Sequence, residues 1–258
     1  MTTAGARRER LATIRRRIER PEAVVLAVVV AGLAVCGWIA PPFWLAVAIA
    51  LQLVIGGLGA VWVIGPVQAR YGFARYGTFA IAAVAATLLG RLLAPVAQLA
   101  GAPLVALLLF GVLWLELRLP EGRSPRLAVD LSLVGIVFAA AAGVAATFPT
   151  SAWPPTVVLV VIAAAVPAMR AAELRGRYGV EAVGQAVLHL LAVAQLGIAL
   201  ALLHLPGVVG AAVLAVGFHA WAGAAEALDS GAPARAVIVE FGSLALLGLL
   251  VALLLRPS

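Results

Sequence analysis

The arginine residues of this 258-residue chain fall in a regular rhythm between long apolar segments. Sixteen of the 18 arginines lie before the first apolar segment or in every second gap after it, and the chain has no lysine. Basic residues concentrate in the cytoplasmic loops of membrane proteins, so this pattern is typical of a polytopic protein with a cytoplasmic N-terminus. The arginines therefore predict how the chain threads a bilayer.

The apolar segments predict an all-α, polytopic transmembrane helix bundle with nine spans. Most are long enough to cross about 30 Å of hydrocarbon at about 1.5 Å per residue. Nine spans place the C-terminus outside; eight spans are the alternative, because Asp229 offsets Arg235 in the eighth gap. The segments lie at 23–40, 43–66, 77–94, 102–118, 128–148, 155–170, 181–204, 207–228 and 237–255.

The composition excludes a water-soluble core, since 64% of the residues are hydrophobic and only 11% are charged. The net charge of +7 resides in the loops and the N-terminal arm, where it suits anionic lipid headgroups rather than nucleic acid. The expected partners are membrane lipids, other membrane subunits or a further copy of the chain. The amino-acid composition is dominated by Ala, Val, Leu, Gly and Arg and has no Lys, which is typical of a GC-rich prokaryotic genome. The predicted location is therefore the cytoplasmic (inner) membrane of a prokaryote.

Several enzyme classes are excluded by missing residues. Without lysine there is no Walker A loop, no Schiff base and no lysine general base. The single cysteine, Cys36, permits no intramolecular disulfide and no Cys-x-x-Cys pair. We therefore expect no cofactor and no metal, and the sequence favours a non-enzymatic protein.

Two regions are predicted. Residues 1–22 form a basic cytoplasmic arm, either an amphipathic helix carrying Leu11, Ile14 and Ile18 on one face or a disordered tail. Residues 23–258 form one polytopic membrane domain.

An internal repeat is indicated by two matching stretches, 75–80 and 177–182, which read Arg-Tyr-Gly-Thr-Phe-Ala and Arg-Tyr-Gly-Val-Glu-Ala. The match predicts two tandem four-helix units, 20–119 and 126–228, followed by one further helix. Four is an even number, so the two units would be parallel repeats. Chance similarity within a small residue alphabet is the alternative.

Ionisable groups inside a membrane are costly and are candidates for function. Most, including Arg91, Glu116 and Glu240, lie within a turn or two of a helix end, and we expect these side chains to reach the interface. Gln52 is expected to form a helix–helix contact.

The hairpin of the seventh and eighth apolar segments is the exception. Helical spacing and antiparallel pairing predict one intramembrane polar cluster of Gln185, His189, His219 and Glu226. Each imidazole either binds a neighbouring carbonyl and holds helices together, or relays protons or contacts a substrate. A metal site is disfavoured, because the spacing matches no known motif.

One stretch resembles the CPBP-type intramembrane proteases. Glu173-Leu174-Arg175-Gly176-Arg177 is followed by a segment ending in His204 and by a later histidine, His219. The family has two adjacent glutamates, but here Ala172 replaces the first, and Gly223 stands where an asparagine is expected. The resemblance implies a hydrolase that uses Glu173, His204 and His219.

These observations lead to three alternative hypotheses about the function. The leading hypothesis is a non-enzymatic, membrane-embedded subunit or scaffold, because deep charge and soluble catalytic parts are nearly absent. The alternative is a small transporter of an apolar or lipid-like solute. The second alternative is a degenerate CPBP-like intramembrane hydrolase.

Overall fold

A computed structural model describes residues 21–65, 72–119, 123–148, 153–203, 205 and 207–254. These residues form nine α-helices and no strand, which confirms the all-α bundle. Residues 1–20 of the predicted arm lie outside the described residues. The helices are α2 (Pro21–Ile39), α3 (Pro42–Ile64), α4 (Ala74–Gly90), α5 (Pro95–Arg118), α6 (Arg123–Thr147), α7 (Trp153–Leu174), α8 (Val180–Leu202), α9 (Gly207–Asp229) and α10 (Ala234–Leu254).

Eight of these helices are long and apolar enough to cross a membrane, and α4 is a shorter apolar helix of 17 residues. Prolines begin α3 and α5 at Pro42 and Pro95, where a missing N–H costs nothing. Gly65 ends α3 with a positive φ of 84°, and its N–H donates to the Val61 carbonyl. Each predicted apolar segment thus corresponds to one helix.

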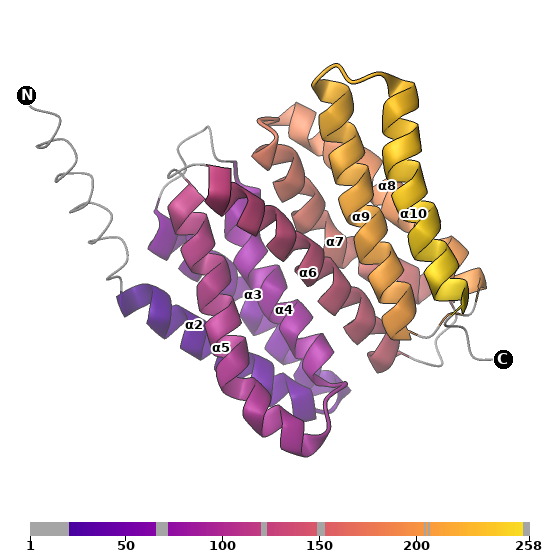
Figure 1. The fold of residues 1–258 in the computed structure, drawn as a ribbon. Helices are drawn as coiled ribbons and strands as arrows, with labels where there is room; N and C mark the ends of the chain where they lie inside the picture. Colours follow the sequence, from indigo (N-terminus) through magenta and orange to yellow (C-terminus); the bar gives the residue numbers. More distant parts are fainter. Residues whose placement is uncertain are drawn as a thin grey trace, which may run out of the picture.

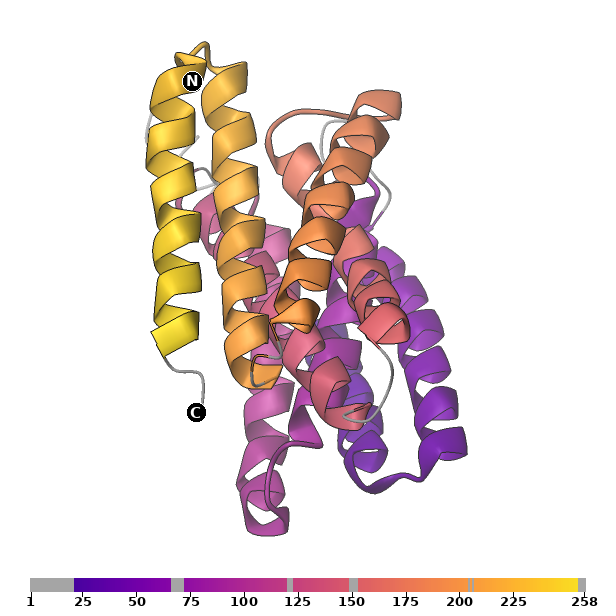
Figure 2. The ribbon, with the colours of Figure 1, turned by 90° about the vertical axis from the view of Figure 1, so that its right-hand side faces the viewer.

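The helices form one bundle in which α6 and α7 lie between two groups, α2–α5 and α8–α10 (Figure 1). Helix α4 is the centre of the packing, since it contacts α2, α3, α5, α6 and α7. Thirteen of its 17 residues are buried. Helix α10 lies at the opposite extreme, at the edge of the bundle in both views, and packs mainly against α9 (Figure 2).

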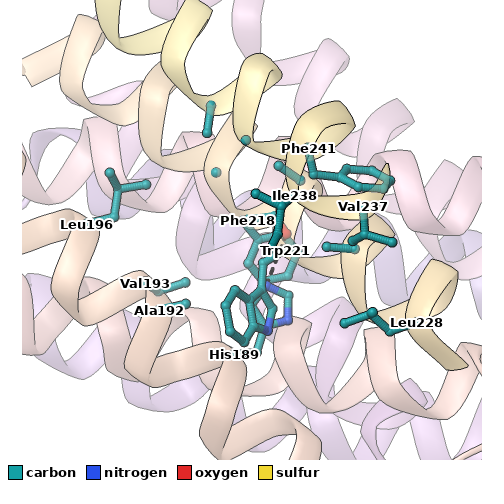
Figure 3. Close-up of a pocket in the computed structure, with 15 residues that line it drawn as sticks. His189, Ala192, Val193, Leu196, Phe218, Trp221, Leu228, Val237, Ile238 and Phe241 are labelled. Atoms are coloured by element: carbon teal, nitrogen blue, oxygen red, sulfur yellow. Dashed lines mark hydrogen bonds between the residues drawn. The ribbon is translucent and has the colours of Figure 1, made fainter. Parts of the chain in front are cut away.

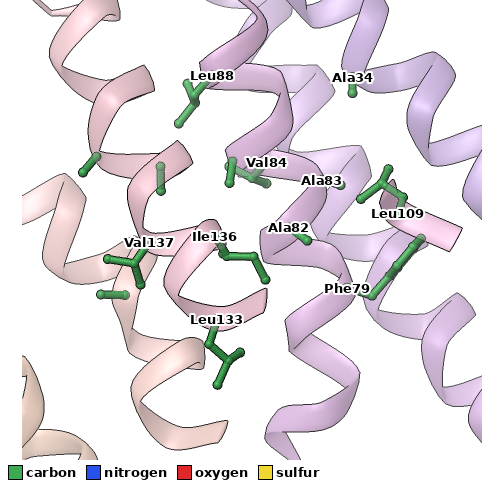
Figure 4. Packing of buried hydrophobic residues seen from close by; sticks show 14 of the residues in the cluster. Ala34, Phe79, Ala82, Ala83, Val84, Leu88, Leu109, Leu133, Ile136 and Val137 are labelled. Atoms are coloured by element: carbon green, nitrogen blue, oxygen red, sulfur yellow. The ribbon is translucent and has the colours of Figure 1, made fainter. Parts of the chain in front are cut away.

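Small residues allow the central helices to approach closely. Gly143 of α6 faces α4 so closely that a Cβ there would lie 2.5 Å from the Leu88 carbonyl carbon. Figure 4 shows Leu133 and Ile136 of α6 on one side of α4, and Leu109 of α5 on the other. Membrane helices gain stability from such close packing, because lipid tails are as apolar as leucine.

The helices α2–α5 and α6–α9 have similar neighbours in chain order. Helix α3 packs on α2 and α4, and α5 packs on α2. In the same way α7 packs on α6 and α8, and α9 packs on α6. This agreement is what two four-helix units would give, although the predicted repeat stays a prediction.

Candidate functional site

Among the described residues, the most deeply buried charged side chains gather where α4 begins and where α5 and α7 end. Arg170 and Glu116 are each 1% exposed, and Glu173 is 3% exposed. Arg75, in the first turn of α4, is also buried. We call Arg75, Glu116, Arg170 and Glu173 the charge cluster; its two positive and two negative groups balance.

Arg170 links two carboxylates. Its Nε donates to Glu116 Oε1 at 3.0 Å and its Nη2 donates to Glu116 Oε2 at 2.6 Å. Its Nη1 donates to Glu173 Oε2 at 3.0 Å. The paired bonds to Glu116 have the bidentate geometry that makes arginine–carboxylate pairs strong and directional. One guanidinium thus joins α5 to α7.

Glu173 extends the cluster to α4. Its Oε1 accepts the backbone N–H of Ala74, the first residue of α4, at 2.9 Å. The first N–H groups of a helix lack partners within the helix, and the helix dipole favours a negative charge there. Gly72 has a φ of +73°, and a Cβ at this position would overlap the Glu173 carboxylate. The approach to α4 therefore requires glycine.

Arg75 completes the cluster, because its Nη2 donates to the Glu116 carbonyl at 3.3 Å. The expectation that Glu116 reaches the interface is wrong. The reason is Arg170, which lies 54 residues away in sequence and provides a buried partner. What the cluster can do chemically is to hold α4, α5 and α7 together.

The four residues predicted to form one polar cluster have separate contacts in the structure. His189 of α8 is buried, and its Nε2 lies 3.1 Å from the Phe218 carbonyl, to which it can donate only as the Nε2–H form. Its ring stacks on Phe218 with centroids 4.1 Å apart. This is the contact expected if the imidazole holds helices together.

The other three residues are more exposed. His219 Nδ1 lies 3.8 Å from Asp130 Oδ2 of α6, and Glu226 Oε2 lies 3.9 Å from Arg175 Nε. Gln185 is half-buried and has no side-chain hydrogen bond to any described residue. No polar contact within the described chain joins any two of the four residues.

The turn between α7 and α8 is tied to the end of α9. Arg177 Nη2 lies 2.9 Å from Asp229 Oδ1, and its Nη1 lies 3.3 Å from Glu181 Oε2. The pKa of Arg177 is raised, mainly by its hydrogen bond to Asp229 and to a smaller extent by its hydrogen bond to Glu181. Burial lowers the pKa of the neighbouring Arg175. These pairs lie at the same end of the bundle as the charge cluster.

Two further polar contacts hold the first helices. Gln52 of α3 donates through Nε2 to Thr87 Oγ1 of α4 at 2.7 Å, which confirms the expected helix–helix contact. Arg91 donates to the Gly37 and Ala40 carbonyls, each at 2.9 Å. Arg91 lies at the end of α4 and is half-buried, where it satisfies carbonyls at the end of α2 that the helix itself leaves without partners; its expected reach to the interface stays a prediction.

The three residues of the protease resemblance are not brought together by any described contact. Glu173 binds Arg170 and the Ala74 N–H, whereas His219 faces Asp130. His204 lies outside the described residues.

A lateral cavity of about 430 Å³ lies among α8, α9 and α10. This volume is within the range of about 300–1,000 Å³ that is common for ligand pockets. Figure 3 shows His189, Phe218 and Trp221 close together, with Val237, Ile238 and Phe241 of α10 beside them. The sequence predicted a site on the α8–α9 hairpin but did not predict that α10 contributes.

The described part of the chain contains no candidate metal site. No group of three or more His, Cys, Asp or Glu residues is arranged there to hold an ion. The chain matches no protein-family model, no curated protein and no solved structure.

Proposed function

We propose that this integral membrane protein is a non-enzymatic, membrane-embedded subunit or scaffold. Its deep polar residues hold helices together and do not handle a substrate. The observation that carries the proposal is the charge cluster, in which Arg170 binds both Glu116 and Glu173 out of contact with solvent. The eight long apolar helices support the membrane setting.

Bound and buried charges are poorly suited to chemistry. A general acid or base must reach the proton that it transfers, either directly or through one water molecule. Glu116 and Arg170 are each only 1% exposed and are bonded to one another. Removing one partner would leave a buried charge uncompensated, which is strongly destabilising. These properties fit a clamp between helices.

We also propose that the bundle end with the charge cluster faces the cytoplasm of a prokaryotic cell. Arg118, Arg126, Arg177 and Arg235 belong to this same end, because successive helices alternate in direction. If the shorter α4 also spans the membrane, nine helices cross it, and the C-terminus then lies outside. Cysteine accessibility from either side of the membrane tests this orientation.

We also propose that the helix groups α2–α5 and α6–α9 are parallel repeats. Support comes from the matching helix neighbours in the two groups and from the Arg-Tyr-Gly match before or within the first turns of α4 and α8. Separate expression of the two halves would test it, because true repeats should each insert with the same orientation.

A transporter of an apolar or lipid-like solute is the second candidate. The cavity among α8, α9 and α10 supports it, because nearly all of the side chains that line it are apolar. Reconstituted vesicles should then move such a solute, and an absence of flux would count against it. The CPBP-like hydrolase has less support, since Glu173 is already bound to Arg170.

Substitutions at His189, His219 and Glu226 test the leading proposal. In a strain that depends on the protein, we expect a variant at any of these positions to lose the cellular phenotype only if it also loses folded protein. A variant such as His189→Phe that stays abundant and inserted in the membrane, yet loses the phenotype, would overturn the proposal. Leu191→Ala is the control, because this side chain on α8 is exposed.

A further inference from the structure

The cavity among α8, α9 and α10 is open on one side of the bundle. Its rim carries the exposed side chains of Trp221, Leu228 and Ile238, whereas its floor carries the buried His189 and Phe218. No charged side chain of the described chain lines it. Because lipid surrounds a spanning bundle, an uncharged molecule of the bilayer can enter this cavity from the side.

One polar atom on the floor of the cavity has no partner. His189 is 3% exposed, and its Nε2 lies 3.1 Å from the Phe218 carbonyl. The hydrogen on Nε2 makes this bond, so Nδ1 carries no hydrogen and is an acceptor. Nδ1 has no hydrogen bond to any described residue, and it is not fully enclosed, unlike His219 Nδ1. Since His189 is otherwise buried and lines the cavity, its accessible Nδ1 faces the cavity.

A second polar atom of opposite character lines the same cavity. The Nε1–H of Trp221 is a donor only, and it has no hydrogen bond to any described residue. Figure 3 shows Trp221 and His189 at the same part of the cavity. No water is present in the hydrocarbon region to satisfy such groups. The cavity therefore offers one acceptor and one donor to a ligand, within a lining that is otherwise apolar.

A hydroxyl group matches both atoms, because it donates one hydrogen bond and also accepts. It can donate to His189 Nδ1 and accept from Trp221 Nε1–H. A ketone or ester carbonyl only accepts, so it would leave Nδ1 without a partner. A charged headgroup is disfavoured by depth. His189 lies nine residues beyond the start of α8, about 13 Å along the helix axis, in a hydrocarbon region about 30 Å thick.

We propose that this cavity binds a lipid alcohol, which is a membrane lipid whose polar part is a single hydroxyl group. The hydroxyl group binds between His189 and Trp221, and the hydrocarbon chain lies against apolar side chains of α8, α9 and α10. Binding of this lipid goes beyond the proposed structural function and leaves it in place, since no bond of the lipid is formed or broken.

Photolabelling of the purified full chain in phosphatidylcholine liposomes tests the site. The probe is hexadecanol with a diazirine in its chain, and the competitors are hexadecanol and its methyl ether, which lacks the O–H donor. Labelling should map to α8, α9 and α10, and hexadecanol should compete roughly threefold to fifteenfold more strongly than the ether, which is the range of one hydrogen bond between spanning helices. Labelling that does not saturate, or equal competition by both molecules, would overturn the proposal, because either result indicates contact with the hydrocarbon chain alone.

His189→Gln separates the ligand contact from the helix contact. The glutamine amide nitrogen lies near the position of Nε2 and can still donate to the Phe218 carbonyl, but no atom replaces Nδ1. We expect a folded protein by size-exclusion chromatography that has lost its preference for the alcohol. Leu191→Ala is the control, because this exposed residue of α8 does not line the cavity, and it should keep the preference. A folded His189→Gln variant with the full preference would overturn the proposal.

Trp221→Phe provides a second variant at a position that is 41% exposed and therefore compatible with folding. Both the alcohol and the ether oxygen can accept from the indole N–H, so the variant should bind both competitors about threefold more weakly and keep the ratio between them. Unchanged binding of both would overturn the contact with Trp221. Binding is the only quantity measured, so a failure here would leave the substitution series at His189, His219 and Glu226 as an independent test of the proposed function.

Discussion

Helices α4 and α10 show opposite relations between polarity and burial. Helix α4 carries Arg75, Thr78 and Thr87, and 13 of its 17 residues are buried. Helix α10 consists largely of leucine, valine and alanine, and Val237 is its one fully buried residue among those described. A soluble protein would place such helices the other way round. Of these two helices, the one with the polar and small side chains is buried, and the one rich in large apolar side chains is exposed.

The physical reason is that lipid solvates leucine as well as protein does, so apolar area gives little drive for helices to associate. Polar groups and close backbone contacts provide the difference instead. Thr87 bonds to Gln52, and Gly143 allows α4 and α6 to touch. The following substitutions test this contrast, from the largest expected effect to the smallest.

Arg170→Met should have the largest effect, because it leaves Glu116 and Glu173 buried without their partner. The expected loss is about 3–5 kcal/mol in the free energy of unfolding. Unfolding in mixed micelles with increasing denaturing detergent measures it. Arg126→Met is the control, since Arg126 is exposed near the start of α6. Equal stability of the two variants would mean that the cluster does not hold the helices.

Gly143→Ala should separate α4 from α6 and cost about 1–3 kcal/mol, because the added methyl group would overlap the backbone of Leu88 and Leu89. Gly135 lies on the same helix, and a Cβ added there would have no neighbouring atom within 4 Å. Gly135→Ala should therefore be neutral or stabilising by up to about 1 kcal/mol. If both alanines behaved alike in the same unfolding assay, close packing at Gly143 would not matter.

Gln52→Leu and Thr87→Val should each cost less, and a double-mutant cycle isolates their interaction. Hydrogen bonds between spanning helices contribute about 0.6 kcal/mol on average and rarely more than about 1.7 kcal/mol. We expect a coupling energy in this range for the bond between α3 and α4. Additive single effects would show that the bond adds nothing to the packing of the two helices.

Leu247→Ala should have the smallest effect on the monomer, within about 0.5 kcal/mol, because its side chain is 59% exposed on α10. Leu109→Ala is the matched comparison in α5, where the side chain is 2% exposed, and should cost about 2 kcal/mol or more. Unfolding in mixed micelles with increasing denaturing detergent measures both values. A large effect at Leu247 would place α10 inside the fold.

The helices could be predicted from the sequence because apolar length and arginine position are local signals. Their ends were predicted less well. Helix α4 begins at Ala74 rather than 77, since protein and not lipid surrounds its polar first turn, and α7 continues past 170 to Leu174, because Arg170 and Glu173 are paired within the bundle.

The charge cluster could not be predicted in the same way. The spacing of Arg170 and Glu173, three residues apart on one helix, was a local signal of a pair. Glu116 lies 54 residues before Arg170, and a single sequence contains no record of that contact. The contact of His189 with a carbonyl was among the expected outcomes, but its partner, Phe218, was not.

The most direct test of the central claim, that the deep charges are structural, is to replace the cluster as a unit. Arg75→Met, Glu116→Met, Arg170→Met and Glu173→Gln, made together, remove all four charges of the cluster but keep similar side-chain volume and the acceptor for the Ala74 N–H. Buried ion pairs can often be exchanged for apolar groups without loss of stability. The measurement is complementation of a deletion strain, together with the amount of folded protein in the membrane. The account predicts that this quadruple variant folds and complements; a folded, abundant variant that fails to complement would contradict it.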